Sequence, residues 1–140
     1  MDWGVTLHGL LPHELDALWP QFWELLSKAN EFDPAVQIEK EATFKALSRN
    51  EVVGFYALDG GHMNMAVTLE IKETHRGRVA EVTAIGGEDM PKWIKGIDLI
   101  SAWAKSKGCE YLQASGRCGW ERVLKDKGFR KVAITVEKAL

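Results

Sequence analysis

Apolar residues recur at helical spacing in the N-terminal third of the chain. In residues 15–29 they follow one another every three or four positions, which is the period of one face of an α-helix. Pro20 lies inside this run and lacks the backbone donor that a helix interior needs, so we expect a bend near Trp19 or two short helices. A second apolar run predicts a helix over residues 38–47, and the alternation in residues 3–8 predicts a short strand.

The pattern changes to that of strands in the middle of the chain. Residues 52–58, 62–71 and 79–85 form three apolar runs that are rich in β-branched and aromatic side chains. An Asp-Gly-Gly turn at residues 59–61 joins the first two runs, and glycine supplies the positive φ angles that tight turns need. A further glycine-containing turn at residues 75–78 leads into the third run. Two consecutive hairpins are therefore predicted.

Helical spacing returns after a Gly-Gly pair at residues 86–87. A broad apolar stripe predicts a helix over residues 90–107, which ends in lysines and a glycine that suit the negative end of a helix. Beyond it the sequence predicts a strand over residues 111–115, a helix over 120–127 and a final strand over 131–138.

The order of these elements predicts an α/β (α+β) fold with one mixed, mostly antiparallel central sheet and helices on both faces. Strands that flank a crossover helix favour parallel pairing, which accounts for the mixed character of the sheet. A length of 140 residues is typical of one domain, so we expect residues 1–140 to form a single domain.

Composition and charge exclude several classes of protein. Apolar residues make up 46% and charged residues 27% of the chain, which excludes a disordered or collagen-like protein. The formal net charge of −2 gives no basic field for a phosphate backbone, so no nucleic-acid partner is expected. No run approaches the roughly 18 uninterrupted apolar residues of a membrane span, so we expect no membrane association and a cytoplasmic location. The four histidines lack the spacing of zinc ligands, so no metal is expected.

The C-terminal half resembles a known family. Residues 120–129 read W-x-x-V-L-x-x-x-G-F, which is similar to the last helix and turn of the GCN5-related N-acetyltransferase (GNAT) family. The order of the predicted elements is also the order found in that family. More narrowly, the Gly-Gly pair at residues 86–87 and the pattern G-R-x-G-W-x-R-V-L-x-x-x-G-F at residues 116–129 look like the small acetyltransferase-like proteins of tailed bacteriophages.

The resemblance implies a site for acetyl-CoA between the fourth and fifth strands. In the family the pyrophosphate lies on backbone amides at the start of the next helix, which form an anion site. The residues implied here are Ile85, Gly86, Gly87, Glu88, Lys92 and Arg117. However, Glu88 and Asp89 stabilise the first helical turn by about 0.3–1 kcal/mol each and also repel a pyrophosphate. An ordinary capped helix is therefore the alternative interpretation of this turn.

Acyl transfer to an amine benefits from a base and an acid. Many members of the family use a carboxylate near the fourth strand and a tyrosine four residues before the closing Gly-Phe. Glu81 is the candidate base, and strand alternation predicts it on the same face as Thr83 and Ile85; an exposed strand glutamate is the alternative. The tyrosine position holds Leu124, which cannot donate a proton, so Tyr111 is the candidate acid.

An aromatic cluster in the first helix indicates either core packing or a contact surface. Trp19 and Trp23 lie at i and i+4, and Phe22 lies beside them. Aromatic residues are enriched at protein interfaces, so these three side chains are candidate interface residues for a protein partner or a homo-oligomer.

Three functions fit these observations. The first is a catalytically degenerate GNAT-fold protein that acts as a binding or assembly component of a tailed phage, in the virion or in the host cytoplasm, without a cofactor. The second is an active acetyl-CoA-dependent N-acyltransferase with Glu81 as base, because proximity alone can supply about 7–11 kcal/mol of the barrier. The third is an inhibitor of a host defence protein.

Overall fold

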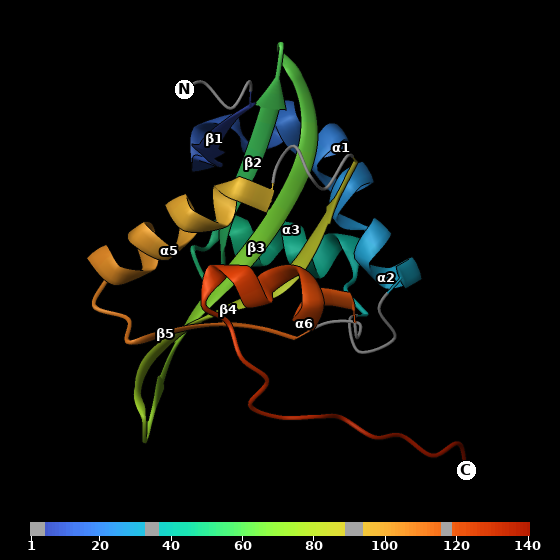
Figure 1. The fold of residues 1–140 in the computed structure, drawn as a ribbon. Helices are drawn as coiled ribbons and strands as arrows, with labels where there is room; N and C mark the ends of the chain where they lie inside the picture. The colour runs from blue at the N-terminus through green and yellow to red at the C-terminus, as the bar shows by residue number, and fades with distance from the viewer. Residues whose placement is uncertain (1–4, 33–36, 89–93, 116–118) are drawn as a thin grey trace.

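The computed structural model describes residues 5–32, 37–88, 94–115 and 119–140. Within these ranges it has one five-stranded sheet with the strand order β1-β2-β3-β4-β5 (Figure 1). The strands are β1 (Val5–Gly9), β2 (Val53–Asp59), β3 (His62–Thr74), β4 (Gly77–Gly87) and β5 (Tyr111–Ala114). The helices are α1 (Leu15–Leu26), α2 (Lys28–Phe32), α3 (Lys40–Ser48), α5 (Ile97–Ser106) and α6 (Gly119–Leu124), with 3-10 turns η1 (Pro12–Glu14), η2 (Ile94–Gly96) and η3 (Lys125–Lys127). No helix in these ranges is long and apolar enough to cross a membrane.

The sheet is mixed and mostly antiparallel, as predicted. The strands β1 to β4 pair antiparallel with their neighbours in the chain, whereas β5 pairs with β4 in parallel. The first hairpin turns at Gly60 and Gly61, whose φ angles of 59° and 85° lie in the left-handed region that glycine tolerates. The helix α5 lies in the connection from β4 to β5, because two parallel strands cannot be joined by a tight turn.

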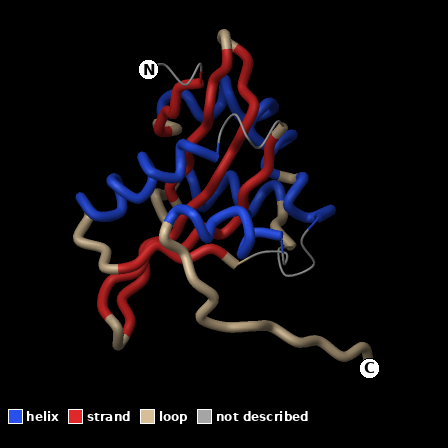
Figure 2. The backbone as a smooth tube through the Cα atoms, in the orientation of Figure 1, coloured by secondary structure: helices blue, strands red, loops and turns tan. Residues whose placement is uncertain are grey.

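Helices cover both faces of the sheet and enclose a core on each face (Figure 2). The core beneath α1 and α3, called the α1 core, contains the buried residues Leu15, Phe22, Leu25, Leu26, Ala29, Leu47, Tyr56, Met63, Ala66 and Ala84. The core beneath α5, called the α5 core, contains Val5, Phe55, Ala57, Met65, Val67, Leu69, Ala80, Val82, Ile97, Ile100, Ala104 and Leu124. Alternate residues of the central strands therefore face opposite cores, as the period of two requires.

Pro20 does not divide the first helix. The helix α1 runs from Leu15 to Leu26 with Pro20 inside it, and the interruption before α2 falls at Ser27 instead of near Trp19. Three apolar residues that follow the proline, among them Phe22 at 0% exposure, are buried against the sheet. Burial of this face holds the helix together despite the missing backbone donor.

The predicted final strand over residues 131–138 is not formed. Residues 131–140, called the C-terminal tail, have no regular structure, and all of them are exposed. In Figures 1 and 2 the tail leaves the end of η3 and extends away from the sheet. The prediction was wrong because a strand is stable only beside a partner strand, and no described strand pairs with the tail.

Candidate functional site

Strand β4 is much longer than its parallel neighbour. It has 11 residues, whereas β5 has 4. The pairing joins Val79–Val82 to Tyr111–Ala114 and stops there. Residues 83–87 are called the β4 edge segment: residues 84–87 pair with β3 on one side, and no described strand pairs with the segment on the other. A strand edge that has no partner strand offers backbone donors and acceptors to an extended ligand.

The β4 edge segment begins with a β-bulge. Thr68 pairs with Ala84 and Leu69 with Val82, so Thr83 is one extra residue in β4. The Thr83 hydroxyl donates to the Thr68 carbonyl oxygen at 3.1 Å and lies 2.7 Å from the Thr68 hydroxyl. Because the single Thr83 proton is used on the carbonyl, the Thr68 hydroxyl donates to Thr83. This polar pair fixes the bulge within the sheet.

The bulge changes which faces the residues of β4 occupy. Before it Val82 packs in the α5 core, and directly after it Ala84 packs in the α1 core and Ile85 against the α5 core. Glu81, which alternates with Val82, is therefore on the opposite face from Ile85. The prediction that Glu81 and Ile85 share a face is wrong, because the extra residue Thr83 shifts the alternation by one.

Gly86 is required by helix packing. A Cβ at this position would overlap the backbone carbonyl of Leu25, at the end of α1. The backbone of α1 therefore occupies the space beside Gly86, and this space is closed to a ligand on that side. The sequence identified the glycine but not the element that approaches it.

Glu88 is already engaged at both its backbone and its side chain. Its amide donates to the Asn64 carbonyl oxygen at 2.8 Å. Its carboxylate lies 3.7 Å from His62 Nε2, and both side chains are at least half exposed. The Glu88 amide is thus unavailable to an anion in this arrangement. Lys92 and Arg117, the two predicted cations, lie outside the described residues, as does Asp89.

The candidate base Glu81 forms an ion pair across the sheet. Its Oε1 atom accepts a hydrogen bond from Lys72 Nζ at 3.0 Å, and this bond raises the pKa of Lys72. In register, Glu81 lies opposite Gln113 of β5 and Glu70 of β3. The carboxylate is therefore held by a cation on a neighbouring strand, two residues before the bulge.

The candidate acid Tyr111 lies at the far end of the β4–β5 pairing. It is opposite Val79, four residues before Thr83, which corresponds to about 13 Å along the strand. The Arg76 guanidinium lies 4.2 Å from the centre of its ring, and the side chain is 40% exposed. The structure therefore does not bring Tyr111 to the β4 edge segment. Leu124, at the family's tyrosine position, is buried in the α5 core.

Asn64 is a buried polar residue that the sequence did not single out. It occupies the bulge between β2 and β3, since Met63 pairs with Leu58 and Met65 with Ala57. Asn64 is 3% exposed, and within the described structure neither its amide nitrogen nor its amide oxygen has a hydrogen-bond partner. An unpaired amide thus lies next to the end of β4, to which its own backbone is bonded through Glu88.

A second titratable cluster lies at the opposite edge of the sheet, on β1 and β2. The Tyr56 hydroxyl donates to Glu14 Oε1 at 3.5 Å, and the His8 ring stacks on Tyr56 with centroids 5.4 Å apart. Burial, together with the neighbouring Glu14 carboxylate, raises the pKa of Tyr56. Within the described residues no three His, Cys, Asp or Glu side chains are placed to hold a metal ion together.

The predicted interface residues form an aromatic cluster between α1 and α3. Trp19 stacks on Phe22 and Trp23 with centroids 6.1 and 5.6 Å apart, and meets the edge of Phe44 at 5.2 Å. Phe22 is completely buried, so it packs in the α1 core and presents no surface. Trp19 and Trp23 are partly exposed, and their role in an interface stays a prediction.

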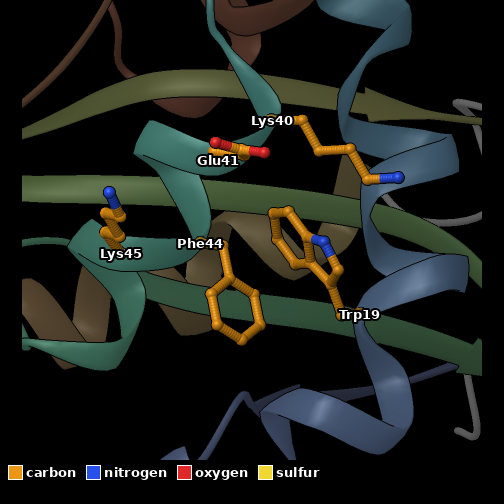
Figure 3. Close-up of a pocket in the computed structure, with 5 residues that line it drawn as sticks. All are labelled: Trp19, Lys40, Glu41, Phe44 and Lys45. Atoms are coloured by element: carbon orange, nitrogen blue, oxygen red, sulfur yellow. The ribbon is translucent and has the colours of Figure 1, made fainter.

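A small hollow lies over this aromatic cluster. Its volume is about 280 Å³, and it is lined by Trp19 from α1 and by Lys40, Glu41, Phe44 and Lys45 from α3. Figure 3 shows the rings of Trp19 and Phe44 side by side, with the charged side chains around them. The hollow is on the α1 side of the sheet and contains none of the predicted cofactor or catalytic residues.

Comparison with solved structures identifies the architecture. An aminoglycoside acetyltransferase from an uncultured soil metagenomic sample matches with a TM-score of 0.70 and 16% identity over 99% of this chain and 98% of that chain. Glucosamine-6-phosphate N-acetyltransferase from Arabidopsis thaliana matches with a TM-score of 0.68 and 13% identity over 96% and 97% of the two chains. A predicted acetyltransferase from Clostridium acetobutylicum, solved with acetyl-CoA, matches with a TM-score of 0.66 and 12% identity over 96% of each chain.

These likenesses show that the chain has the fold of GNAT acetyltransferases. The predicted fold class is therefore confirmed. No protein-family model and no curated protein matches the sequence.

Proposed function

We propose that this protein is an acyl-CoA-dependent N-acyltransferase that binds its acyl donor along the β4 edge segment. The observation that carries the proposal is the unpaired side of residues 83–87 next to the bulge at Thr83. The pantetheine arm of coenzyme A is an extended chain with two amides. Such a chain can add to an exposed strand edge through backbone hydrogen bonds. The presence of acetyl-CoA in one of the similar structures supports this choice of donor.

The described residues fit the extended arm better than the pyrophosphate. Ile85 lies within the segment that no described strand pairs on the β5 side. The Glu88 amide is bonded to Asn64, and the Glu88 carboxylate repels phosphate. The phosphates would therefore depend on residues outside the described ranges, for which Lys92 and Arg117 are the candidates.

In the reaction the acceptor amine attacks the thioester carbon, the carbon–sulfur bond breaks, and the leaving thiolate takes up a proton. The β4 edge segment contributes by orienting the thioester, and orientation alone can supply about 7–11 kcal/mol of the barrier. Glu81, the base that the sequence predicts, takes the amine proton through water, and the hydrogen bond from Lys72 orients its carboxylate. Two of the similar structures are enzymes named for amino-sugar substrates, so amino sugars are the acceptors to try first.

Calorimetric titration with acetyl-CoA and hydrogen exchange test the proposal together. We expect a dissociation constant in the micromolar range and slower amide exchange in residues 83–87 when the ligand is bound. The outer edge of β1 serves as the internal control, because no described strand pairs with it either and its exchange should not change. Absence of binding at millimolar acetyl-CoA, or protection elsewhere only, would contradict the proposal.

A second candidate function is that of a catalytically degenerate protein that acts as a binding or assembly component. The sequence pattern favours a tailed phage as the assembly. The observation in its favour is that the predicted acid and base are engaged elsewhere. Tyr111 contacts Arg76, Glu81 pairs with Lys72, and Leu124 is buried. Protein that does not bind acetyl-CoA but is retained with phage particles in a sedimentation assay would favour this candidate over the enzyme.

A further inference from the structure

The hollow between α1 and α3 is lined by two aromatic rings. Trp19 from α1 and Phe44 from α3 meet edge to face with their centroids 5.2 Å apart, and both side chains are only partly buried. Trp23 stacks on Trp19 and holds the indole ring in place, with centroids 5.6 Å apart. Partly exposed rings offer apolar surface and π electrons to a further ring. This part of the lining therefore suits a flat aromatic molecule.

The charged groups around the hollow have an excess of positive charge. Lys40 and Lys45 contribute two positive charges, and Glu41 contributes one negative charge. Glu41 lies four residues before Lys45, a spacing at which opposite charges on a helix often pair. Neither lysine side chain, however, forms an ion pair or a hydrogen bond with a described residue. Figure 3 shows the two lysines on either side of Glu41, and both ammonium groups are available to an anion.

The size and charge of the hollow limit the kind of ligand. Its volume is about 280 Å³, whereas pockets for drug-sized ligands measure about 300–1,000 Å³, so it accommodates one ring with a short side group. One negative charge on the ligand balances the single excess positive charge of the lining. An ammonium ligand also attracts aromatic rings by the cation–π interaction, but the two lysines repel it.

We propose that the hollow between α1 and α3 is a binding site for a small aromatic carboxylate. The ring of the ligand lies against Trp19 and Phe44, and its carboxylate pairs with the ammonium groups of Lys40 and Lys45. The hollow shares no residue with the β4 edge segment. The inference therefore does not depend on the proposed acyl donor.

Titration with benzoate, followed by nuclear magnetic resonance, tests the site. The indole N–H signal of Trp19 is the readout, and it is assigned among the six tryptophans by its loss in Trp19→Phe. We expect this signal to shift with a dissociation constant of about 0.1–1 mM, because so small a ligand makes few contacts. Cyclohexanecarboxylate has the same charge without π electrons, so it should bind about fivefold more weakly. Benzylamine has the same ring with the opposite charge and should not shift the signal.

Removal of the lysine charges tests the second half of the site. Lys40→Gln and Lys45→Gln should each weaken benzoate binding by about threefold, since exposed ion pairs are weak, and the two together by about tenfold. Lys105→Gln is the matched control, because it removes an exposed lysine charge from α5 on the other face of the sheet, and it should leave the affinity unchanged. Thermal unfolding of each variant checks that the chain is folded.

Three results would overturn the proposal. The first is an unshifted Trp19 signal at about 10 mM benzoate, ten times the weakest expected dissociation constant. The second is an affinity for benzoate that stays the same when both lysines are replaced, because the carboxylate would then bind elsewhere. The third is equal binding of benzylamine or cyclohexanecarboxylate, because the hollow would then select neither for the negative charge nor for the aromatic ring.

Discussion

Asn64 offers a direct test of the packing around the candidate site. Its amide is buried without a partner in the described structure, and a desolvated, unpaired polar group costs about 1–3 kcal/mol. Asn64→Leu keeps a similar volume and removes this cost, so we expect the free energy of unfolding to rise by about 1 kcal/mol in urea denaturation without ligand.

The matched variant Asn64→Asp separates polarity from shape. It keeps the shape but buries a charge, so it should lower the free energy of unfolding. If Asn64→Leu instead lowers stability by more than about 1 kcal/mol, the amide has a partner in solution and the interpretation of this residue is wrong.

Single residues also show why the site was only partly predictable from sequence. The lack of a proton donor at Leu124 can be seen in the sequence, because it depends only on the type of side chain. The orientation of Glu81 relative to Ile85 was predicted wrongly, because the bulge at Thr83 has no sequence signature. The bond between Lys72 and Glu81 depends on the register of two strands, which the alternation alone does not fix.

The contact between α1 and β4 makes Gly86 a sensitive position. Gly86→Ala places a Cβ against the Leu25 carbonyl, and the helix and strand must move apart. We expect a loss of about 1–3 kcal/mol in the free energy of unfolding, as for other overpacked sites. Gly9→Ala is the control, because a Cβ there would lie at an ordinary 3.8 Å from Phe55. Equal effects of the two substitutions in thermal or urea denaturation would show that the α1 contact is not as close as described.

The elements that bury a face were predicted better than those that do not. The three strands over residues 52–85 and the apolar helix that contains α5 were found, because their periodicity reflects the core that they cover. The prediction of a bend or break at Pro20 was wrong, because burial of Phe22 and its neighbours outweighs the unfavourable helix propensity of proline. The tail at residues 131–138 has the pattern of a strand, and what a pattern cannot predict is the presence of a partner strand.

The whole molecule is expected to unfold as one unit, because both cores share one sheet. Adjacent residues of β3 pack in different cores: Ala66 lies in the α1 core and Val67 in the α5 core. Loss of packing on one face should therefore loosen the strands that support the other. Leu26→Ala in the α1 core and Ile100→Ala in the α5 core should each cost about 2–5 kcal/mol, because both side chains are almost completely buried.

Native-state hydrogen exchange distinguishes this cooperative unfolding from separate unfolding of the two faces. If the sheet couples the cores, Leu26→Ala should speed exchange of the most protected amides in α5 as much as in α1. Ile100→Ala should do the same in the opposite direction. An effect confined to the mutated face in both variants would mean that the two layers open independently. The β4 edge segment, which lies between the layers, would then have two faces that can open separately, and its geometry would depend on which core is intact.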